Sequence, residues 1–168
     1  MQISMYRASV PVLARALRNL ASVLRKGEAH ATARNVDPAV LLGYRLAPDM
    51  FPLTRQVQIA SDTAKGCVAR LAGVDVPSYP DDETTFAQLL ARIDRTIAFI
   101  EGFQPAQIDG SEDRSVTLKM RTGEINFQGL PYLFEFVLPN VYFHSTTAYA
   151  ILRHCGVDLG KRDFLGAP

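Results

Sequence analysis

Five apolar residues near the start of the chain recur at the spacing of a helix with a single apolar seam. Val10, Leu13, Leu17, Leu20 and Leu24 are separated by 3, 4, 3 and 4 positions. This spacing places them on one face of an α-helix. That face must pack against other helices so that its apolar side chains are removed from water. It predicts a long helix over residues 4–32 in a protein built mainly from packed helices.

Capping residues and stop signals indicate where the other helices begin and end. Asp37 precedes Pro38, a favoured start for a short helix, and Gly73 and Gly102 are favoured stops. Asp49 and Asp82 are the expected caps of the second and third long helices. The further predicted helices cover residues 38–43, 50–72, a segment from the Asp82 cap to Gly102, and 131–154.

A short alternating segment separates the last two long helices. Val116, Leu118 and Met120 alternate with polar residues, the sequence RTGE follows, and Ile125 and Phe127 alternate back. This pattern predicts a small β-hairpin that needs the helices for support. With 168 residues the chain is expected to form one domain over residues 1–168, an all-α four-helix bundle with a short extra helix and this hairpin.

Composition excludes several classes of protein. A net charge of +1 is too small for a nucleic-acid-binding surface, and no apolar run reaches the ~18 residues of a membrane span. The two isolated cysteines indicate a reducing, cytoplasmic setting. The first 27 residues contain five basic and no acidic side chains, which is also typical of a transit peptide, but the apolar spacing favours a core helix.

His144 is the residue of the last long helix that is best suited to a chemical role. Asn140 lies four positions earlier and therefore on the same helix face. Three roles are open: a hydrogen-bonded pocket or core histidine, which is the interpretation we favour, a metal ligand, or a general acid–base group. His154 is expected to interact with the end of its helix, and His30 to lie near the surface.

Two further features of the sequence have structural explanations. Pro139 removes a hydrogen bond to the carbonyl of Glu135 and predicts a kink one turn before His144. The sequence DGSED resembles the start of a calcium loop, but Arg114 stands where glycine is needed and Met120 where glutamate is needed. A turn leading into the hairpin is the better interpretation.

Three long strings resemble one bacterial family, catalogued as a domain of unknown function and grouped with the DinB/YfiT-like proposed metalloenzymes. The strings are SMYRASVPV, RLAPDMFPLTRQVQIASDTAKG and PNVYFHSTTAYAILRHCGVDLGKRDFLG, and the resemblance runs from Ser4 to Gly166. It implies a DinB-like bundle with up-down-down-up helix order, which often forms homodimers. Residues 73–81 would then connect two parallel helices, and nine extended residues reach only ~30 Å.

The resemblance also implies where a site would lie. The superfamily's metal site uses one histidine of the second long helix and two of the fourth, spaced HxxxH. These positions fall near Gln56 and on Asn140 and His144, so one of three ligands remains. We therefore expect no cofactor and no tightly bound metal, with a divalent metal at His144 as the weaker alternative. The polar cluster could instead bind a small molecule, with Tyr6 and Tyr142 as further pocket candidates.

Three functions follow as hypotheses. The first is a cytoplasmic, DinB-like homodimer with a degenerate metal site that binds a small molecule or acts as a stress-related accessory protein. The second is an enzyme that uses His144 with a metal or as a general base, for thiol transfer or detoxification as the resemblance implies. The third is a structural homodimer with no active site.

Overall fold

The computed structural model describes residues 3–120 and 123–166, which are mostly helical with one small antiparallel sheet. No helix in these two ranges is both long enough and apolar enough to cross a membrane. The elements in chain order are α1 (Met5–Arg34), α2 (Pro38–Gly43), α3 (Leu53–Ala72), α4 (Phe86–Glu101), α5 (Pro105–Ile108), β1 (Ser115–Met120), β2 (Gly123–Gln128), α6 (Gly129–Pro131), the π-helical segment η1 (Tyr132–Val137), α7 (Leu138–His154) and α8 (Lys161–Leu165).

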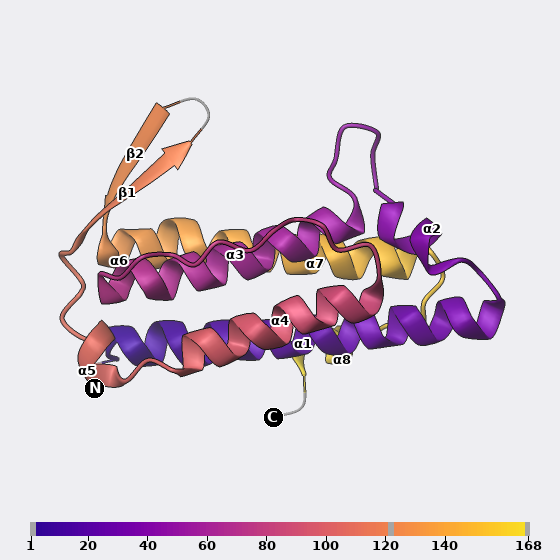
Figure 1. The fold of residues 1–168 in the computed structure, drawn as a ribbon. Helices are drawn as coiled ribbons and strands as arrows, with labels where there is room; N and C mark the ends of the chain where they lie inside the picture. The colour runs from indigo at the N-terminus through magenta and orange to yellow at the C-terminus, as the bar shows by residue number, and fades with distance from the viewer. Residues whose placement is uncertain (1–2, 121–122, 167–168) are drawn as a thin grey trace.

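The long helices α1, α3, α4 and α7 lie side by side along one axis (Figure 1). The chain runs one way in α1 and α7 and the opposite way in α3 and α4. Between α3 and α4 the linker of residues 73–85 returns along the length of the helices. The two strands project from one end of this helical body, and residues 44–52 project on the same side near the other end (Figure 1).

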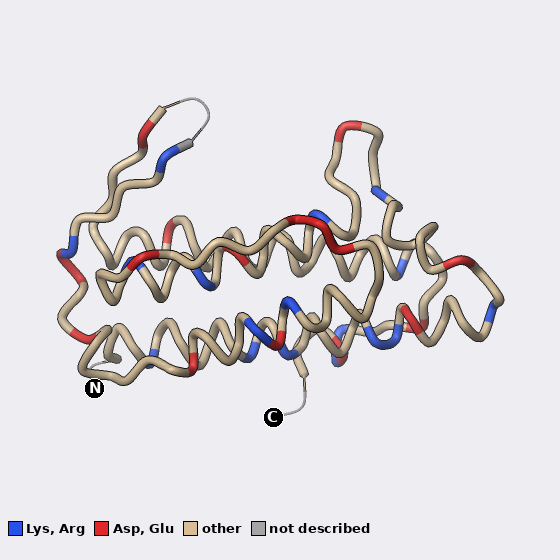
Figure 2. Tube along the Cα trace, viewed as in Figure 1, with Lys and Arg blue, Asp and Glu red and all other residues tan. Residues whose placement is uncertain are grey.

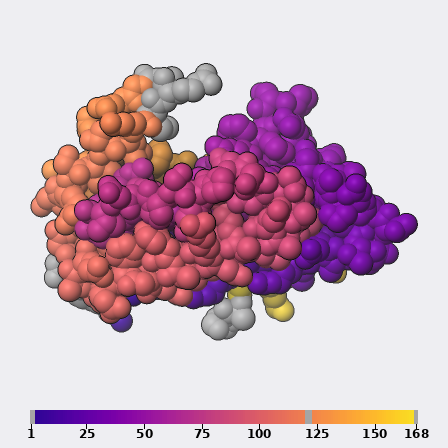
Figure 3. Space-filling model, in the orientation of Figure 1, coloured from indigo at the N-terminus to yellow at the C-terminus, as the bar shows by residue number. Residues whose placement is uncertain are grey.

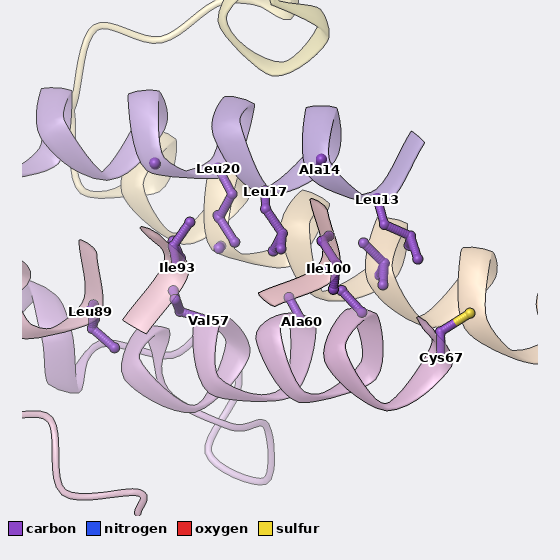
Figure 4. Close-up of a cluster of buried hydrophobic side chains, with 14 of the residues drawn as sticks. Leu13, Ala14, Leu17, Leu20, Val57, Ala60, Cys67, Leu89, Ile93 and Ile100 are labelled. Carbon is purple, nitrogen blue, oxygen red and sulfur yellow. The ribbon is translucent and has the colours of Figure 1, made fainter. Parts of the chain in front are cut away.

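The predicted seam of α1 forms part of the core. All five seam residues are at most 3% exposed, while Pro11 lies on the exposed face of the helix. The Ser4 hydroxyl accepts a hydrogen bond from the Arg7 amide and caps the start of α1. Figure 4 shows side chains from α1, α3 and α4 meeting in one apolar cluster, among them Leu13, Leu17, Leu20, Val57, Ala60, Leu89, Ile93 and Ile100.

Two predicted helix starts are wrong. Asp49 does not cap α3, because Met50 and Phe51 lie outside the helix and Pro52 is its extended N-cap residue. A residue that precedes proline is disfavoured in helical geometry, which accounts for the later start. Asp82 does not cap α4 either. The cap is Thr85, whose hydroxyl accepts from the amide of Gln88 in a reciprocal capping box.

The predicted last helix is present but is not regular throughout. The helical segments α6, η1 and α7 follow one another without a break from Gly129 to His154, and the six residues of η1 form a π-helix. The amide of Leu138 donates to the carbonyl of Leu133, five residues back. This wider turn lies immediately before Pro139, where a regular hydrogen bond is unavailable. The sequence predicts a kink at this place, and the structure has a π-helical turn there.

The predicted hairpin is confirmed. Strands β1 and β2 pair antiparallel from Ser115 with Gln128 to Met120 with Gly123. Val116 and Leu118 of β1 are buried. The centre of the predicted RTGE turn, residues 121–122, lies outside the described residues.

The linker between α3 and α4 is held by a network of charges on the helices. The Arg92 side chain is only 2% exposed and bonds Asp62 of α3 and Glu83 of the linker, both at 2.9 Å. It also pairs with Asp81 at 3.0 Å, and Figure 2 shows the acidic part of the linker crossing the helices. Tyr79 places its ring 3.7 Å from the ammonium of Lys65. These contacts fix the path of a connection that the apolar pattern alone does not specify.

Candidate functional site

The structure brings Gln56 and His144 into direct contact. Gln56 lies in the first turn of α3 and is 1% exposed, and His144 lies in α7 and is 7% exposed. The His144 Nδ1 and Gln56 Oε1 atoms are 2.7 Å apart. This bond joins residues 88 positions apart in the chain and links two neighbouring helices.

The partners of Gln56 determine which nitrogen of His144 carries the proton. The Gln56 amide nitrogen donates to the backbone carbonyl of Phe51 at 3.0 Å. Because a carbonyl only accepts, the amide nitrogen must face Phe51 and the amide oxygen must face His144. That oxygen also only accepts, so Nδ1 of His144 carries the hydrogen. In the neutral ring Nε2 is then a free acceptor, and no group in residues 3–120 or 123–166 bonds to it.

The surroundings of His144 favour its neutral form. Burial lowers the pKa of His144, and the positive charge of Arg55 lowers it further. The ring of Phe143 contacts the imidazole edge-on, with 5.2 Å between ring centres. The site therefore presents an unprotonated imidazole nitrogen at neutral pH.

Asn140 lies one turn before His144, as the sequence predicts, but its amide is directed to its own helix. The Asn140 Nδ2 atom donates to the Phe136 carbonyl at 2.7 Å. The acceptor lies within the irregular turn η1. Asn140 is therefore a neighbour of His144 whose amide nitrogen is already engaged.

A cavity lies on the side of the hairpin, and its wall contains none of Gln56, Asn140 and His144. It has a volume of about 230 Å³ and lies between α3, β1 and η1. Its wall includes Arg55, the neighbour of Gln56, and Phe136, the residue that Asn140 contacts. Figure 3 shows the surface hollowed between the hairpin and the projecting residues 44–52. The other residues of the wall are Ile59, Asp62, Thr63, Arg70, Leu118, Lys119 and Tyr132.

Two of these wall residues form a polar pair that sequence reasoning missed. The Arg70 guanidinium donates to the Tyr132 hydroxyl at 3.1 Å. Burial raises the pKa of Tyr132 to about 12, so its hydroxyl keeps its proton at neutral pH. Arg70 and Tyr132 are 62 positions apart in the chain, and no local pattern connects them.

The donors near His144 do not fit a tightly held transition metal. The oxygen of Gln56 is occupied by Nδ1–H of His144, and amide oxygens bind zinc and nickel poorly. Within residues 3–120 and 123–166, no three His, Cys, Asp or Glu side chains are grouped as metal ligands would be. Only Nε2 of His144 is a good nitrogen donor, and structural or catalytic zinc needs three or four protein ligands.

The remaining predicted site residues lie elsewhere. Tyr6 is at the start of α1, where its amide donates to Asp109 at 2.8 Å, at the opposite end of the helical body from the start of α3. Tyr142 is 43% exposed and lines a separate pocket between α1, α7 and α8. His154 is in the last turn of α7, as predicted, and its Nε2 atom is 3.0 Å from the hydroxyl of Tyr44.

Comparisons with known proteins agree with this architecture. A sequence model of the family described as "Domain of unknown function (DUF1993)" matches residues 5–165. A crystal structure of a DinB family member protein from Shewanella denitrificans is 43% identical in sequence and superposes with a TM-score of 0.88. That match covers 97% of this chain and 92% of the other. A search among curated proteins found no match.

Proposed function

Because the chain belongs to the family described as domain of unknown function DUF1993, within the DinB-like superfamily, we propose that it is a small-molecule-binding protein with a degenerate metal site. In this proposal the four long helices form an up-down-down-up bundle, and His144 recognises the ligand. The supporting observation is the chain of hydrogen bonds from the Phe51 carbonyl through Gln56 to His144. These bonds leave Nε2 of His144 as a hydrogen-bond acceptor. They also occupy the Gln56 oxygen that a metal would need as a ligand.

In this proposal the ligand of His144 extends into the cavity between α3, β1 and η1, although His144 is not part of its wall. Its wall combines apolar surface from Ile59 and Phe136 with the charged groups of Arg55 and Asp62. A ligand for this site is a small polar compound with a hydrogen-bond donor for Nε2 of His144. Pockets of this kind use a few fixed polar groups to orient a ligand against apolar walls.

A binding screen with matched variants tests the proposal. Fragments that carry hydroxyl, amide or thiol donors would be screened by ligand-observed NMR against the wild type, His144→Ala and His154→Ala. We expect a set of fragments that bind the wild type and His154→Ala but not His144→Ala. Identical binding profiles for all three proteins would contradict the proposal and favour a structural protein with no site at His144.

Metal content tests the degenerate site separately. The protein would be purified without a tag and assayed for zinc, nickel and iron. We expect less than one tenth of an equivalent of each metal, because Nε2 of His144 is the single strong metal ligand at this site. Stoichiometric metal in the wild type that is lost in His144→Ala would instead support a metal-dependent protein.

A second candidate function is catalysis with His144 as a general base. The lowered pKa and the fixed tautomer favour it, because a neutral imidazole with a free Nε2 atom can accept a proton from a bound thiol, hydroxyl or water. Thiol transfer or detoxification reactions need such a base. A turnover assay with thiol substrates would support this candidate only if activity is lost in His144→Gln and retained in His154→Gln.

A further inference from the structure

The guanidinium of Arg70 lies on the face of α3 that lines the cavity between α3, β1 and η1. Ile59, Thr63 and Arg70 belong to the wall of this cavity. With Gly66 they recur at intervals of 4, 3 and 4 positions, which places all four on one helix face. A Cβ atom at Gly66 would collide with Nη1 of Arg70, so the guanidinium lies over this glycine. The charged group therefore lies along the cavity face of the helix.

Tyr132 holds Arg70 from the opposite wall. Tyr132 belongs to η1, is 1% exposed, and its hydroxyl accepts from Nη1 of Arg70 at 3.1 Å. Within residues 3–120 and 123–166 this hydroxyl makes no other hydrogen bond, and its raised pKa of about 12 keeps the proton in place. The hydroxyl hydrogen is a buried donor for which the described residues supply no acceptor. Arg70 has further N–H donors beyond the one that Tyr132 receives.

The charge of Arg70 is not balanced by a carboxylate, in contrast to the other charges of the wall. Asp62 pairs with two cations at 2.8 and 2.9 Å, and Arg55 pairs with an aspartate of the linker. Lys119 lies opposite Glu124 in the antiparallel ladder, which offsets its charge at longer range. In the part of the chain that the structure describes, no carboxylate oxygen lies within 4.0 Å of an Arg70 nitrogen.

The rest of the cavity suits a compact apolar group. Its volume is about 230 Å³, and Ile59, Leu118 and Phe136 contribute apolar surface. The rings of Tyr132 and Phe136 lie nearly parallel, with an interplanar angle of 16°. The cavity thus combines one unbalanced guanidinium and one buried hydroxyl with an apolar wall large enough for a single ring.

We propose that this cavity binds a small aromatic monocarboxylate, with the carboxylate on Arg70 and the ring against Phe136. A carboxylate accepts two parallel N–H bonds from a guanidinium, and it also supplies the acceptor that the Tyr132 hydroxyl lacks. One guanidinium near the negative charge of Asp62 matches a single negative charge and disfavours the second charge of a phosphate monoester. The inference rests on the proposed function, because the ligand of His144 is proposed to extend into this cavity, and it names the acid group of that ligand.

Titration of the full chain with benzoate at neutral pH, followed in ¹H–¹⁵N NMR spectra, tests the site. We expect saturable shifts at amides of α3, β1 and η1. Benzamide has nearly the same shape without the charge and should bind at least about tenfold more weakly. Phenyl phosphate should also bind more weakly than benzoate. No saturation at about 10 mM benzoate, or affinities for benzamide or phenyl phosphate equal to that for benzoate, would overturn the proposal.

Arg70→Met tests the charged group itself. It should weaken benzoate binding at least about tenfold and remove the preference over benzamide. Arg25→Met removes the same charge from an exposed position of α1 outside the cavity, and it should bind benzoate as the wild type does. Equal benzoate binding by the two variants would contradict a carboxylate on Arg70.

Gly66→Ala tests the position of the guanidinium while keeping every charge. Its methyl group displaces Nη1 of Arg70, which is the far end of a flexible side chain, so we expect the fold to be kept. Benzoate binding should weaken about fivefold, the scale of one hydrogen bond to a charged group. Gly43→Ala, where a Cβ atom would meet no heavy atom within 4 Å, should leave it unchanged. Wild-type affinity in Gly66→Ala would contradict the placement of the carboxylate.

His144→Ala separates this inference from the proposed function. His144 is not part of the cavity wall, and benzoate has no hydrogen to donate to Nε2, so benzoate should bind this variant as it binds the wild type. Loss of benzoate binding in His144→Ala would contradict a carboxylate held by Arg70. Donor-bearing fragments that bind His144→Ala and the wild type equally would contradict the proposed function and leave the benzoate result unchanged, so the two failures are distinguishable.

Discussion

The imidazole of His144 is fixed by a hydrogen bond that only one protonation pattern allows. Gln56 can only accept at the atom that faces His144, because its amide nitrogen is bound to a backbone carbonyl. Protonation of Nε2 would place a positive charge in a buried setting near Arg55. The fold therefore favours the neutral ring of His144.

His144 should make the protein less stable in mild acid. Its pKa is lower in the folded protein than the value of about 6.5 expected when unfolded. Above the unfolded pKa both states are neutral, and the pKa difference has no effect on the free energy of unfolding. As the pH falls below it, the unfolded state binds the proton more readily, so stability is lost until the folded pKa is passed. Urea unfolding between pH 8 and pH 5 measures this loss.

Two variants isolate the contribution of His144. His144→Gln should flatten the pH dependence of the unfolding free energy, while His154→Gln at an exposed position should leave the wild-type slope. An unchanged slope in His144→Gln would show that other groups cause the loss.

Arg92 is the residue on which the linker most depends. Its side chain is 2% exposed and pairs with Asp62 and Glu83. Burial acts to raise the pKa of Glu83, but hydrogen bonds from Arg92 and Gln58 outweigh it and lower the pKa. Loss of one partner leaves charges without compensation in a partly buried setting.

Arg92→Met should therefore destabilise the protein by about 3 kcal/mol, as expected when a buried ion pair loses one member. Arg18→Met is the matched control, because the pair that Arg18 forms with Glu101 is 52% and 43% exposed. The control should change stability by at most about 1 kcal/mol. Urea unfolding of the three proteins measures the difference, and equal effects of the two substitutions would be inconsistent with a buried network.

At the scale of elements, local sequence signals predicted the helices and the hairpin better than their ends. The apolar seam of α1 and the alternation of β1 and β2 are properties of short segments, so they could be read directly. The cap predicted for α4 is wrong because several polar residues precede Phe86 and could act as caps. The start predicted for α3 is wrong because Phe51 precedes Pro52 and is disfavoured in helical geometry. The sequence did not predict that η1 is a π-helical turn, because Pro139 indicates a disturbed helix but not its geometry.

The attachment of the hairpin depends on a close backbone approach at Gly129. A Cβ atom at this position would lie 1.9 Å from the Ser111 carbonyl oxygen and 3.2 Å from Leu71. Gly129→Ala should therefore shift the junction of β2 and α6 and destabilise the protein by about 2 kcal/mol. Thermal unfolding followed by circular dichroism measures this effect.

Gly160→Ala provides the control for that substitution. A Cβ atom at Gly160 would meet no heavy atom within 4 Å, and its φ of −128° suits any residue. The change in stability should be below about 0.5 kcal/mol. A Gly129→Ala protein as stable as Gly160→Ala would show that the junction can move without loss.

At the scale of the whole molecule, the sequence predicted the members of the site only in part. Resemblance to a family indicated Gln56, Asn140 and His144, and the structure joins the first and last of them. It could not indicate the Phe51 carbonyl or the pair of Arg70 and Tyr132, because these contacts depend on how α3, η1 and α7 pack. The placement of Tyr6 could not be predicted for a similar reason, since its distance from His144 depends on the direction in which each helix runs.

The central claim is that His144 presents a neutral, unprotonated Nε2 atom and does not hold a metal tightly. Long-range ¹H–¹⁵N NMR of the histidine side chains, recorded at pH 7.5 before and after one equivalent of Zn²⁺, tests it most directly. We predict that His144 has hydrogen on Nδ1 only, and that Zn²⁺ leaves its two nitrogen signals in place. Hydrogen on Nε2, or a stoichiometric Zn²⁺-induced shift of that nitrogen, would contradict the account.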